Sequence, residues 1–527
     1  MTRCVVRTES LGGSKLSRAA RDGQLREWYV PVPHDGAAWA DYAAHVRNSV
    51  NADWFDQLSD AIAPSGRAAA RLKRSAGGRG LVVTTGQQPG LFGGPLMSLV
   101  KAISARAIAD TLEEMLDIPV APVFWAATDD ADFDEAAVVS VALDGGAREL
   151  CIEARAPAGT PMARVPMGDD VRDLAAYLRD ASGSASHASF LRDALEAYQP
   201  GVTVGDAYVA LLRKILEPLE ISVLDASHPS VASAAAPLLR RAVSNAPAVA
   251  DAVRKRSDEI AAHGFTPQVE EVPGLSLVFV NANGTKRRLA LSDAASLGEL
   301  DEHQFFSSTV LLRPVMERAI LPTATYVAGP GEYAYFAQVT AVAEALDSPR
   351  PMVMPRWSMS LLEPRIARLL EQLGVEPEAL ADPNAVEGLI ARRRLPPDTD
   401  AALHALRGAT VSGIDAVRGA NDGLVSAEVL DGLQRSIEHR VQRAERRLLA
   451  AVKRRESDLM RQIGTVRGAL YPHGAPQERK LAYVAFLARY GTELLDDMLA
   501  AARTHARSLV AGTPSLGRSP TSTPAGV

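Results

Sequence analysis

Apolar residues of this chain form short, nearly continuous runs in its first two thirds and recur at helical spacing in its last third. The run Leu81–Val83 leads into a glycine-rich turn and then into a segment with apolar residues at helical spacing. This order predicts a buried strand, a turn and a helix that a proline opens. A second run, residues 119–127, predicts a strand of the parallel kind that is covered on both faces. Strand, helix and strand together predict a βαβ unit and an α/β fold.

The same alternation continues to about residue 360, with two interruptions. A helix is predicted around Val209–Leu216 and a strand over Ile221–Asp225. Regions of about 140–200 and 230–300 look like insertions, and the second contains a predicted hairpin with its turn at Asn281–Gly284. Further short apolar segments, expected to be strands or strand ends, lie at 310–314, 324–328 and 352–355.

Helical periodicity marks both ends of the chain. Residues 1–75 are predicted to form a helical lead-in, packed on a core over residues 76–362, and residues 363–510 to form a helical domain. In that domain apolar residues recur at spacings of three, four or seven, at Leu430, Leu433, Ile437, Val441, Ala444, Leu448, Val452, Leu459, Ile463 and Val466. This seam is typical of a coiled coil or long helical hairpin; the alternative is an amphipathic helix packed on its own domain.

Composition narrows the class of protein. A chain of 527 residues is expected to hold roughly three to four domain-sized units. The net charge of −6 implies no large basic surface, so we expect no nucleic-acid partner. The two cysteines, Cys4 and Cys151, argue against a disulfide framework and suit a reducing cytoplasm. No apolar run has the length of a signal-peptide core or a membrane span, so we expect a cytoplasmic protein without a membrane partner. Residues 511–527, rich in Ser, Thr, Pro and Gly, are predicted to be a disordered tail.

The first candidate for chemistry is the turn after the strand at 81. Its backbone N–H groups and the following helix N-terminus could hold an anion, and the amides of Gln87 and Gln88 could bind polar substrate groups. The spacing of Gly86, Gly90, Gly93 and Gly94 fits neither the dinucleotide fingerprint nor the Walker loop. A tight turn that binds nothing is the alternative.

The second candidate is the acidic segment 128–135, which directly follows the strand at 119–127. Asp130, Asp132 and Glu135 lie where open α/β sheets place their sites, and their repulsion favours a general base near neutral pH. They could equally bind a substrate ammonium or Mg²⁺, and the alternative is a solvated loop that caps a helix. The spacing imitates an EF-hand loop, but Glu135 and Val141 stand where that loop needs a glycine and a bidentate acid.

The third candidate is the strand, glycine turn and helix over 328–338. Glu332 lies in the first turn of the predicted helix, where a carboxylate stabilises the dipole. Arg313 follows a short predicted strand, and either binds a carboxylate or phosphate or forms a structural salt bridge. We predict that these turns, the acidic segment and Arg313 converge on one cleft. No histidine pair at metal-ligand spacing and no HExxH is present, so no metal site is predicted. No GxSxG elbow is present either, which argues against serine hydrolysis.

Together these motifs resemble the bacillithiol-biosynthesis cysteine-adding enzyme family. The matching stretches occur in the family's order and cover most of the chain apart from its ends. They are Thr85–Ser104, Pro122–Glu135, Val310–Gln338 and Leu470–Arg479, with weaker similarity at Gly264–Val269 and Val223–Pro229.

The resemblance implies a Rossmann-like parallel-sheet core with two inserted connecting segments and a C-terminal α-helical coiled coil through which the protein forms a homodimer. It also implies a ligase that joins L-cysteine to glucosaminyl-malate in the last step of bacillithiol biosynthesis. Carried over to this chain, the catalytic residues are Asp130 and Asp132. The substrate-binding residues are Gly86, Gln87, Gln88, Gly94, Lys101, Glu135, Arg313, Gly329, Gly331 and Glu332.

The chain departs from the family at three positions. Ala131 stands where the acidic segment usually has a histidine, Thr128 where it has a glycine, and Thr309 where an asparagine is expected. Two alternatives therefore stay open: a ligase for another amino acid or amine, and a catalytically diverged dimeric ligand-binding paralogue. The cofactor is unknown. ATP with Mg²⁺ would activate the carboxyl group, but the chain has no KMSKS-like lysine loop.

Overall fold

The computed structural model describes residues 3–183, 186–282, 284–296, 306–382 and 384–511, and these form two compact units. The larger unit contains the described residues up to 141, 149–362 and those from 478 onward. The smaller unit contains residues 142–148 and 363–477. The predicted disordered tail falls almost wholly outside the described residues.

A five-stranded parallel sheet lies at the centre of the larger unit, in the order β11-β10-β2-β3-β6. Its strands are β2 (Leu81–Gln87), β3 (Val120–Ala126), β6 (Ser222–Asp225), β10 (Thr323–Ala328) and β11 (Val353–Pro355). Almost every residue of these strands is buried, as their continuous apolar runs predict. All five carboxyl ends therefore meet at one edge of the sheet, which confirms the α/β prediction.

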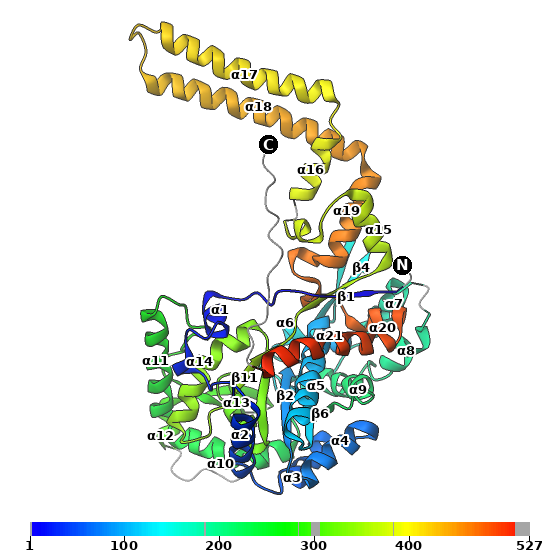
Figure 1. Cartoon of the computed structure of the whole chain (residues 1–527), viewed down its shortest axis with the longest axis vertical. Coiled ribbons are helices and arrows are strands. Elements are labelled where there is room, and N and C mark those ends of the chain that lie inside the picture. The colour runs from blue at the N-terminus through cyan, green and yellow to red at the C-terminus, as the bar shows by residue number, and fades with distance from the viewer. Residues whose placement is uncertain (1–2, 184–185, 283, 297–305, 383, 512–527) are drawn as a thin grey trace. The chain divides into compact units, whose positions relative to one another are not determined.

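Helices cover this sheet (Figure 1). The connection from β2 to β3 is α5 (Leu96–Leu116), which packs on both strands, and α14 (Pro330–Ala345) follows β10. The helices expected between about residues 15 and 75 are α1 (Lys15–Arg21), α2 (Gly36–Asn48), α3 (Trp54–Ile62) and α4 (Gly66–Gly77).

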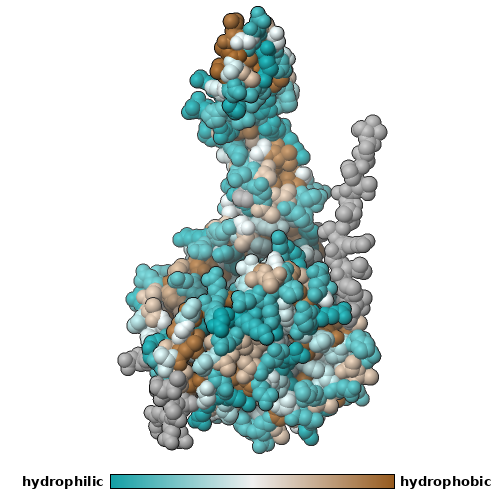
Figure 2. Space-filling view, turned by 90° about the vertical axis from the view of Figure 1, so that its left-hand side faces the viewer, coloured by the Kyte–Doolittle hydropathy of each residue, from teal (hydrophilic) through white to brown (hydrophobic). Residues whose placement is uncertain are grey.

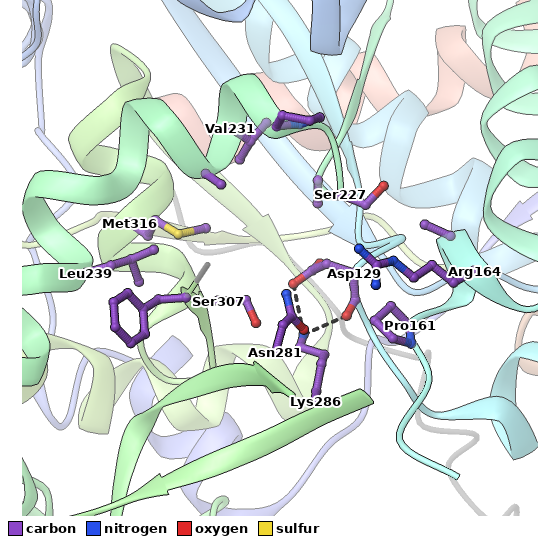
Figure 3. A pocket seen from close by; sticks show the side chains of 15 residues that line it. Asp129, Pro161, Arg164, Ser227, Val231, Leu239, Asn281, Lys286, Ser307 and Met316 are labelled. Atoms are coloured by element: carbon purple, nitrogen blue, oxygen red, sulfur yellow. Dashed lines mark hydrogen bonds and ion pairs between the residues drawn. The ribbon is translucent and has the colours of Figure 1, made fainter. Parts of the chain in front are cut away.

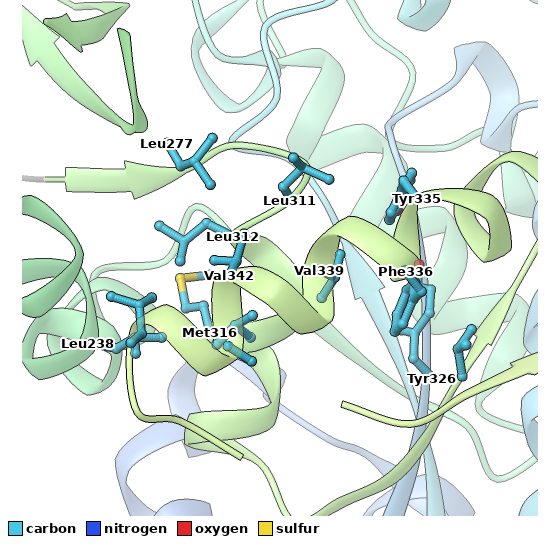
Figure 4. Packing of buried hydrophobic residues seen from close by; sticks show 14 of the residues in the cluster. Leu238, Leu277, Leu311, Leu312, Met316, Tyr326, Tyr335, Phe336, Val339 and Val342 are labelled. Atoms are coloured by element: carbon cyan, nitrogen blue, oxygen red, sulfur yellow. The ribbon is translucent and has the colours of Figure 1, made fainter. Parts of the chain in front are cut away.

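One large hydrophobic cluster joins the sheet to helices α10 (Pro229–Ser244), α13 (Arg313–Ile320) and α14 (Figure 4). The rings of Tyr326 and Phe336 stack with centroids 5.6 Å apart, so strand β10 and helix α14 lock together. Leu311, Leu312 and Met316 are buried in the same cluster. Truncating one such leucine to alanine typically costs about 2–5 kcal/mol of stability.

The remaining elements of the larger unit lie around this core. The predicted hairpin is confirmed as β7 (Leu275–Ala282) and β8 (Thr285–Ala290), with Val280 opposite Arg287. The predicted strand at 310–314 is wrong: residues 310–312 form a turn, and α13 (Arg313–Ile320) begins there because Pro314 suits a first helical turn. The other elements are β1 (Val5–Thr8), α6 (Phe133–Ala136), β4 (Val138–Leu143), β5 (Gly146–Cys151), α7 (Asp170–Ala181), α8 (Ala188–Ala194), α9 (Val204–Leu216), α10 (Pro229–Ser244), α11 (Ala246–Ala262), α12 (Leu291–Ser296), β9 (Phe306–Ser308), β12 (Met359–Leu362), α20 (Tyr483–Tyr490) and α21 (Glu493–Val510), with β4 and β5 running into residues 142–148.

The smaller unit is helical, and its longest part is an antiparallel pair of helices (Figure 1). These are α17 (Pro397–Ala420) and α18 (Ala427–Arg455), accompanied by α15 (Pro364–Leu373), α16 (Ala385–Arg393) and α19 (Ser457–Leu470). The predicted seam is not one helix, because the chain breaks at Glu456 between α18 and α19. Residues from 478 to 510 cluster with the larger unit, whereas the sequence placed them in the helical domain.

Two further features bear on the sequence analysis. Among the helices of the described ranges, none combines the length and apolar character needed to cross a membrane. Cys4, which is buried, and Cys151, which is exposed, are not joined by a disulfide.

Candidate functional site

The candidate site begins where β2 ends. Gly86 has no room for a side chain, since a Cβ atom there would lie 2.9 Å from the Trp125 carbonyl oxygen of β3. Gln87 ends the strand and Gln88 follows it, both half-buried. Further along the turn, Gly94 has a φ of +79°, a conformation that favours glycine. The turn therefore holds two amide side chains at the carboxyl edge of the sheet.

A buried lysine supports this end of β2. Lys101, in α5, is 1% exposed, and its Nζ donates to the Gly86 carbonyl oxygen and, over 3.1 Å, to Gln87 Oε1. The same Nζ pairs with Glu332 Oε2 at 2.7 Å. Burial lowers the pKa of Lys101 from its ordinary value, although the Glu332 carboxylate acts in the opposite direction. Three acceptors thus surround a group that has three N–H donors.

The lysine also determines how the Gln87 amide is turned. An ammonium group has donors only, so the oxygen of Gln87 must face Lys101 and its Nε2 must face away. That Nε2 lies 3.4 Å from Glu135 Oε1, and the Nε2 of Gln88 donates to Asp130 Oδ2 over 2.8 Å. Both glutamines therefore present donors to the acidic segment, which lies beside them as the sequence predicted.

The acidic segment has an internal order. The two oxygens of Asp130 are both engaged, since Oδ2 accepts from Gln88 and Oδ1 accepts from the Asp132 backbone N–H over 3.0 Å. Asp132 caps the short helix α6 by accepting from the Glu135 N–H over 3.2 Å. Partial burial and then repulsion from Asp132 and Asp130 raise the pKa of Glu135. Asp132 therefore caps a helix, which was the alternative to a role in catalysis. Its side chain is exposed to solvent.

The turn after β10 brings Glu332 to the same edge. Its Oε2 accepts from the Gly329 backbone N–H over 2.8 Å, and its Oε1 accepts from the Tyr326 hydroxyl over 2.6 Å. Burial opposes ionisation, but the Lys101 ammonium and the Tyr326 hydroxyl outweigh it, so the pKa of Glu332 is lowered. Gly331, in the first turn of α14, has space for a side chain.

Arg313 is bound to protein partners. Its guanidinium donates to Glu317 Oε2 over 2.9 Å and stands 4.7 Å from the centroid of the Tyr326 ring. Its side chain is 14% exposed. Arg313 therefore forms a structural salt bridge, which was one of its two expected roles. Binding of a substrate by Arg313 stays a prediction.

Three polar residues of this network, Thr84, Glu317 and Tyr326, were not among the expected site residues. The Thr84 hydroxyl donates to Glu317, which is buried beside Arg313. Glu317 follows Arg313 by four residues, the spacing of a helical ion pair. The pair was missed because residues 310–314 were expected to form a strand and not the start of a helix. Thr84 and Tyr326 lie inside apolar strands, where a buried polar side chain implies a partner without indicating which one.

Segment 470–479 is one of the stretches that resemble the family, and Glu478, near its end, has a structural role. Glu478 forms a buried pair with Arg356, with an oxygen 2.5 Å from Nη2 and another 2.8 Å from Nη1. Arg356 is 1% exposed. This bidentate pair attaches the segment from Glu478 to the chain that leaves β11.

Taken together, the edge of the sheet carries the carboxylates of Asp130, Asp132, Glu135 and Glu332 around one ammonium and two amides. Such an edge favours cationic amino groups of a ligand, and a carboxylate there can accept a proton from an amine that acts as a nucleophile. Within the part of the chain that the structure describes, no three His, Cys, Asp or Glu side chains are placed to hold a metal ion.

Comparison with known proteins gives two matching family models. Residues 41–357 match the N-terminal Rossmann-like domain of bacillithiol biosynthesis BshC, and residues 427–508 match its C-terminal coiled-coil domain. The chain is 32% identical over 467 residues to a protein of Koribacter versatilis, covering 85% of this chain and 86% of the relative. It is 31% identical over 431 residues to one of Solibacter usitatus (79% and 81%) and 27% identical over 555 residues to one of Chlorobaculum tepidum (94% and 95%). All three relatives carry the name "Putative cysteine ligase BshC".

Proposed function

This chain belongs to the bacillithiol biosynthesis BshC family, and from this membership we propose that it is a cytoplasmic ligase that joins L-cysteine to glucosaminyl-malate. The product is an amide, formed between the cysteine carboxyl and the amine of the sugar in the last step of bacillithiol synthesis. The observation that carries the proposal is the convergence of Gln87, Gln88, Lys101, Asp130 and Glu332 at one edge of the sheet in a member of this family.

The roles of the residues follow from their chemistry. Asp130 or Asp132 binds the ammonium of a substrate or removes the proton that the attacking amine must lose. The Nε2 groups of Gln87 and Gln88 donate to substrate oxygens, with Gln87 held in that orientation by Lys101. Gly86, Gly94 and Gly329 keep the turns close to the substrate, while Glu135, Arg313, Gly331 and Glu332 surround it.

Amide formation from a free carboxylate needs an activated acyl group. ATP, as a co-substrate, would supply this by converting the carboxylate into an adenylate with release of pyrophosphate. The amine then displaces AMP and loses one proton, so all atoms are accounted for. A carboxylate at the edge of the sheet is suited to accept that proton.

The test is detection of product by mass spectrometry from purified protein, L-cysteine and glucosaminyl-malate, with and without ATP and Mg²⁺. We expect bacillithiol to form only when ATP is present. Product from another amino acid or amine in a panel would identify a related ligase. Ligand-induced thermal stabilisation without any product would instead identify a diverged binding protein, which the alanine at 131 would suit.

We also propose that the protein forms a homodimer through α17 and α18. Apolar side chains gather on this helical pair (Figure 2), although Leu430 and Val441 are already buried. Val429 and Leu433 are 58% and 46% exposed and lie four residues apart on one face of α18. Leu406, Val417 and Leu424 are exposed in the same pair of helices and the loop between them. A face of this kind is typical of a contact with another chain.

The double substitution Val429→Glu and Leu433→Glu is expected to convert dimers to monomers, because it places two charges in the apolar contact. Multi-angle light scattering would measure the mass. The control is Ser436→Glu with Arg440→Glu, at two exposed polar positions of the same helix with the same spacing. A wild-type protein that is already monomeric, or a dimer that survives the apolar substitutions, would contradict this proposal.

A further inference from the structure

The turn that joins β2 to α5 has a strained backbone. Phe92, Gly93 and Gly94 follow one another with φ angles of +52°, +87° and +79°. Glycine adopts such angles readily, whereas a phenylalanine does so at a cost in free energy and keeps the angle only where its surroundings hold it. Strained residues of this kind gather at functional sites, so the contacts that hold this turn are candidates for a role in the proposed ligation.

Tyr198, a residue of the loop between α8 and α9, supplies several of these contacts. Its hydroxyl accepts from the Gly93 N–H over 2.9 Å and lies 3.5 Å from the Gly90 carbonyl oxygen. The same N–H also donates to the Gly90 oxygen over 3.0 Å, so the hydroxyl meets both ends of a bond inside the turn. The Tyr198 ring packs against the Phe92 ring, with centroids 5.0 Å apart. Hydroxyl and ring therefore both hold the turn in its strained conformation.

The other half of the site has its own backbone contacts with a nearby segment. Residues 161–164 lie beside the acidic segment (Figure 3). The Met162 N–H donates to the Asp130 carbonyl oxygen over 2.8 Å, and the Ala163 N–H donates to the Thr128 carbonyl oxygen over 2.9 Å. These two bonds fix the acidic segment to residues 161–164.

The same segment is paired with the end of the loop that carries Tyr198. The Gly201 N–H donates to the Met167 oxygen, and the Met167 N–H donates to the Val202 oxygen, each over 2.9 Å. The Val204 N–H donates to the Val165 oxygen, also over 2.9 Å. The chain between β5 and β6 therefore holds the acidic segment through its first part and the glycine turn through Tyr198.

We propose that Tyr198 is a positioning residue of the proposed ligation: it fixes the glycine turn relative to the acidic segment and so keeps Gln88 against Asp130. The Gln88 Nε2 lies 2.8 Å from Asp130 Oδ2, and the two side chains come from these two elements. Tyr198 is 1% exposed, so it acts through Gln88 and not by touching the substrate. The inference rests on the proposed function, because the role belongs to the same reaction.

The first test is Tyr198→Phe, which keeps the ring and removes the hydroxyl. We expect kcat/KM of ligation to fall about 10-fold to 100-fold, mainly through a raised KM, because Gln88 donates to a substrate oxygen in the proposed site. A merely structural role would lower the amount of folded enzyme, and hence kcat, without changing KM. The control is Tyr208→Phe in α9, which removes an equally buried hydroxyl without a hydrogen-bond partner in the described part of the chain and should leave both constants unchanged.

A double substitution tests whether Tyr198 acts through Gln88. In a Gln88→Ala background the loss caused by Tyr198→Phe should largely disappear, because the side chain that Tyr198 positions is already absent. An equal loss of kcat/KM in the wild-type and Gln88→Ala backgrounds would overturn the proposal, as would an unchanged KM in Tyr198→Phe.

Hydrogen exchange followed by mass spectrometry tests the turn without any turnover. In Tyr198→Phe the amides of residues 90–96 should exchange about tenfold faster than in wild type, while those of strand β10 keep their wild-type rate. Unchanged exchange at residues 90–96 would contradict the role of Tyr198. Absence of product from the wild-type protein would instead contradict the proposed ligation, so the two proposals can fail separately.

Discussion

Asp130→Asn is expected to lower the turnover of ligation by about 10²–10⁴-fold, the usual contribution of a positioned acid or base. The substitution keeps the shape of the side chain but removes its charge. It also costs one of two hydrogen bonds, because an amide cannot accept from both the Gln88 side chain and the Asp132 backbone N–H. The loss of stability should be only about 1 kcal/mol, since the side chain is half-exposed. Mass-spectrometric turnover with both substrates, together with thermal unfolding, measures the two effects.

The matched control for this experiment is Asp134→Asn. Asp134 belongs to the same acidic segment and is exposed, yet lies outside the proposed site, so its turnover should equal that of wild type. Asp132→Asn tests the second proposed carboxylate, whose backbone contact to Asp130 should survive the change. Wild-type turnover in both Asp130→Asn and Asp132→Asn would remove these residues from the mechanism.

The parallel core was predictable because burial on both faces leaves a strong signal in the sequence. The apolar runs that begin at residues 81 and 119 form strands β2 and β3. These strands pair along their whole length, from Leu81 opposite Val120 to Gln87 opposite Ala126. Pairing of this kind places Gln88 and Asp130 at the same edge, and their contact of 2.8 Å agrees with that expectation. Here the order of elements was enough to predict that the glutamine turn and the acidic segment lie at one edge of the sheet.

The prediction of secondary structure was wrong at a short segment that carries two conflicting signals. Residues 310–314 contain three apolar residues, which suggests a strand, but Pro314 fits the first turn of a helix. In the structure a helix begins at Arg313. Leu311 and Leu312 are buried in the hydrophobic cluster and not in a sheet. Burial alone does not reveal the backbone conformation of so short a run.

The partners of Lys101 were beyond prediction for a different reason. Lys101 and Glu332 are 231 positions apart, and the turn that joins them in space depends on β10 pairing with β2. Glu332 alone has a sufficient local explanation as a helix-terminal carboxylate. Lys101 lies among apolar residues of α5, which indicate burial but not the partner of its charge. Only the pairing of the two strands turns these separate residues into one ion pair.

Lys101→Met is expected to destabilise the larger unit by about 3 kcal/mol, the low end of the cost of leaving a buried charge unpaired. The low end applies because Glu332 keeps its contacts with Tyr326 and the Gly329 N–H. Urea unfolding followed by tryptophan fluorescence would measure this, since all five tryptophans lie in the larger unit. Lys73→Met, at an exposed position of α4, is the control and should change the free energy of unfolding by less than about 0.5 kcal/mol.

A second substitution tests whether the lost ion pair is the cause. Removing the charge of Glu332 as well, in Lys101→Met with Glu332→Gln, should cost less than the sum of the two single substitutions, by about 0.5–3 kcal/mol. Strict additivity would mean that the two residues stabilise the fold independently.

The dependence of this loss on pH follows from the lowered pKa of Glu332. A carboxylate with a lowered pKa in the folded state contributes stability above its unfolded value, about 4.3, and loses it as the pH falls through the folded pKa. The difference between wild type and Lys101→Met should therefore be full near neutral pH and should shrink below about pH 4.3 as Glu332 takes up its proton. A difference that stays constant across this range would show that Lys101 stabilises the end of β2 through the Gly86 and Gln87 oxygens alone.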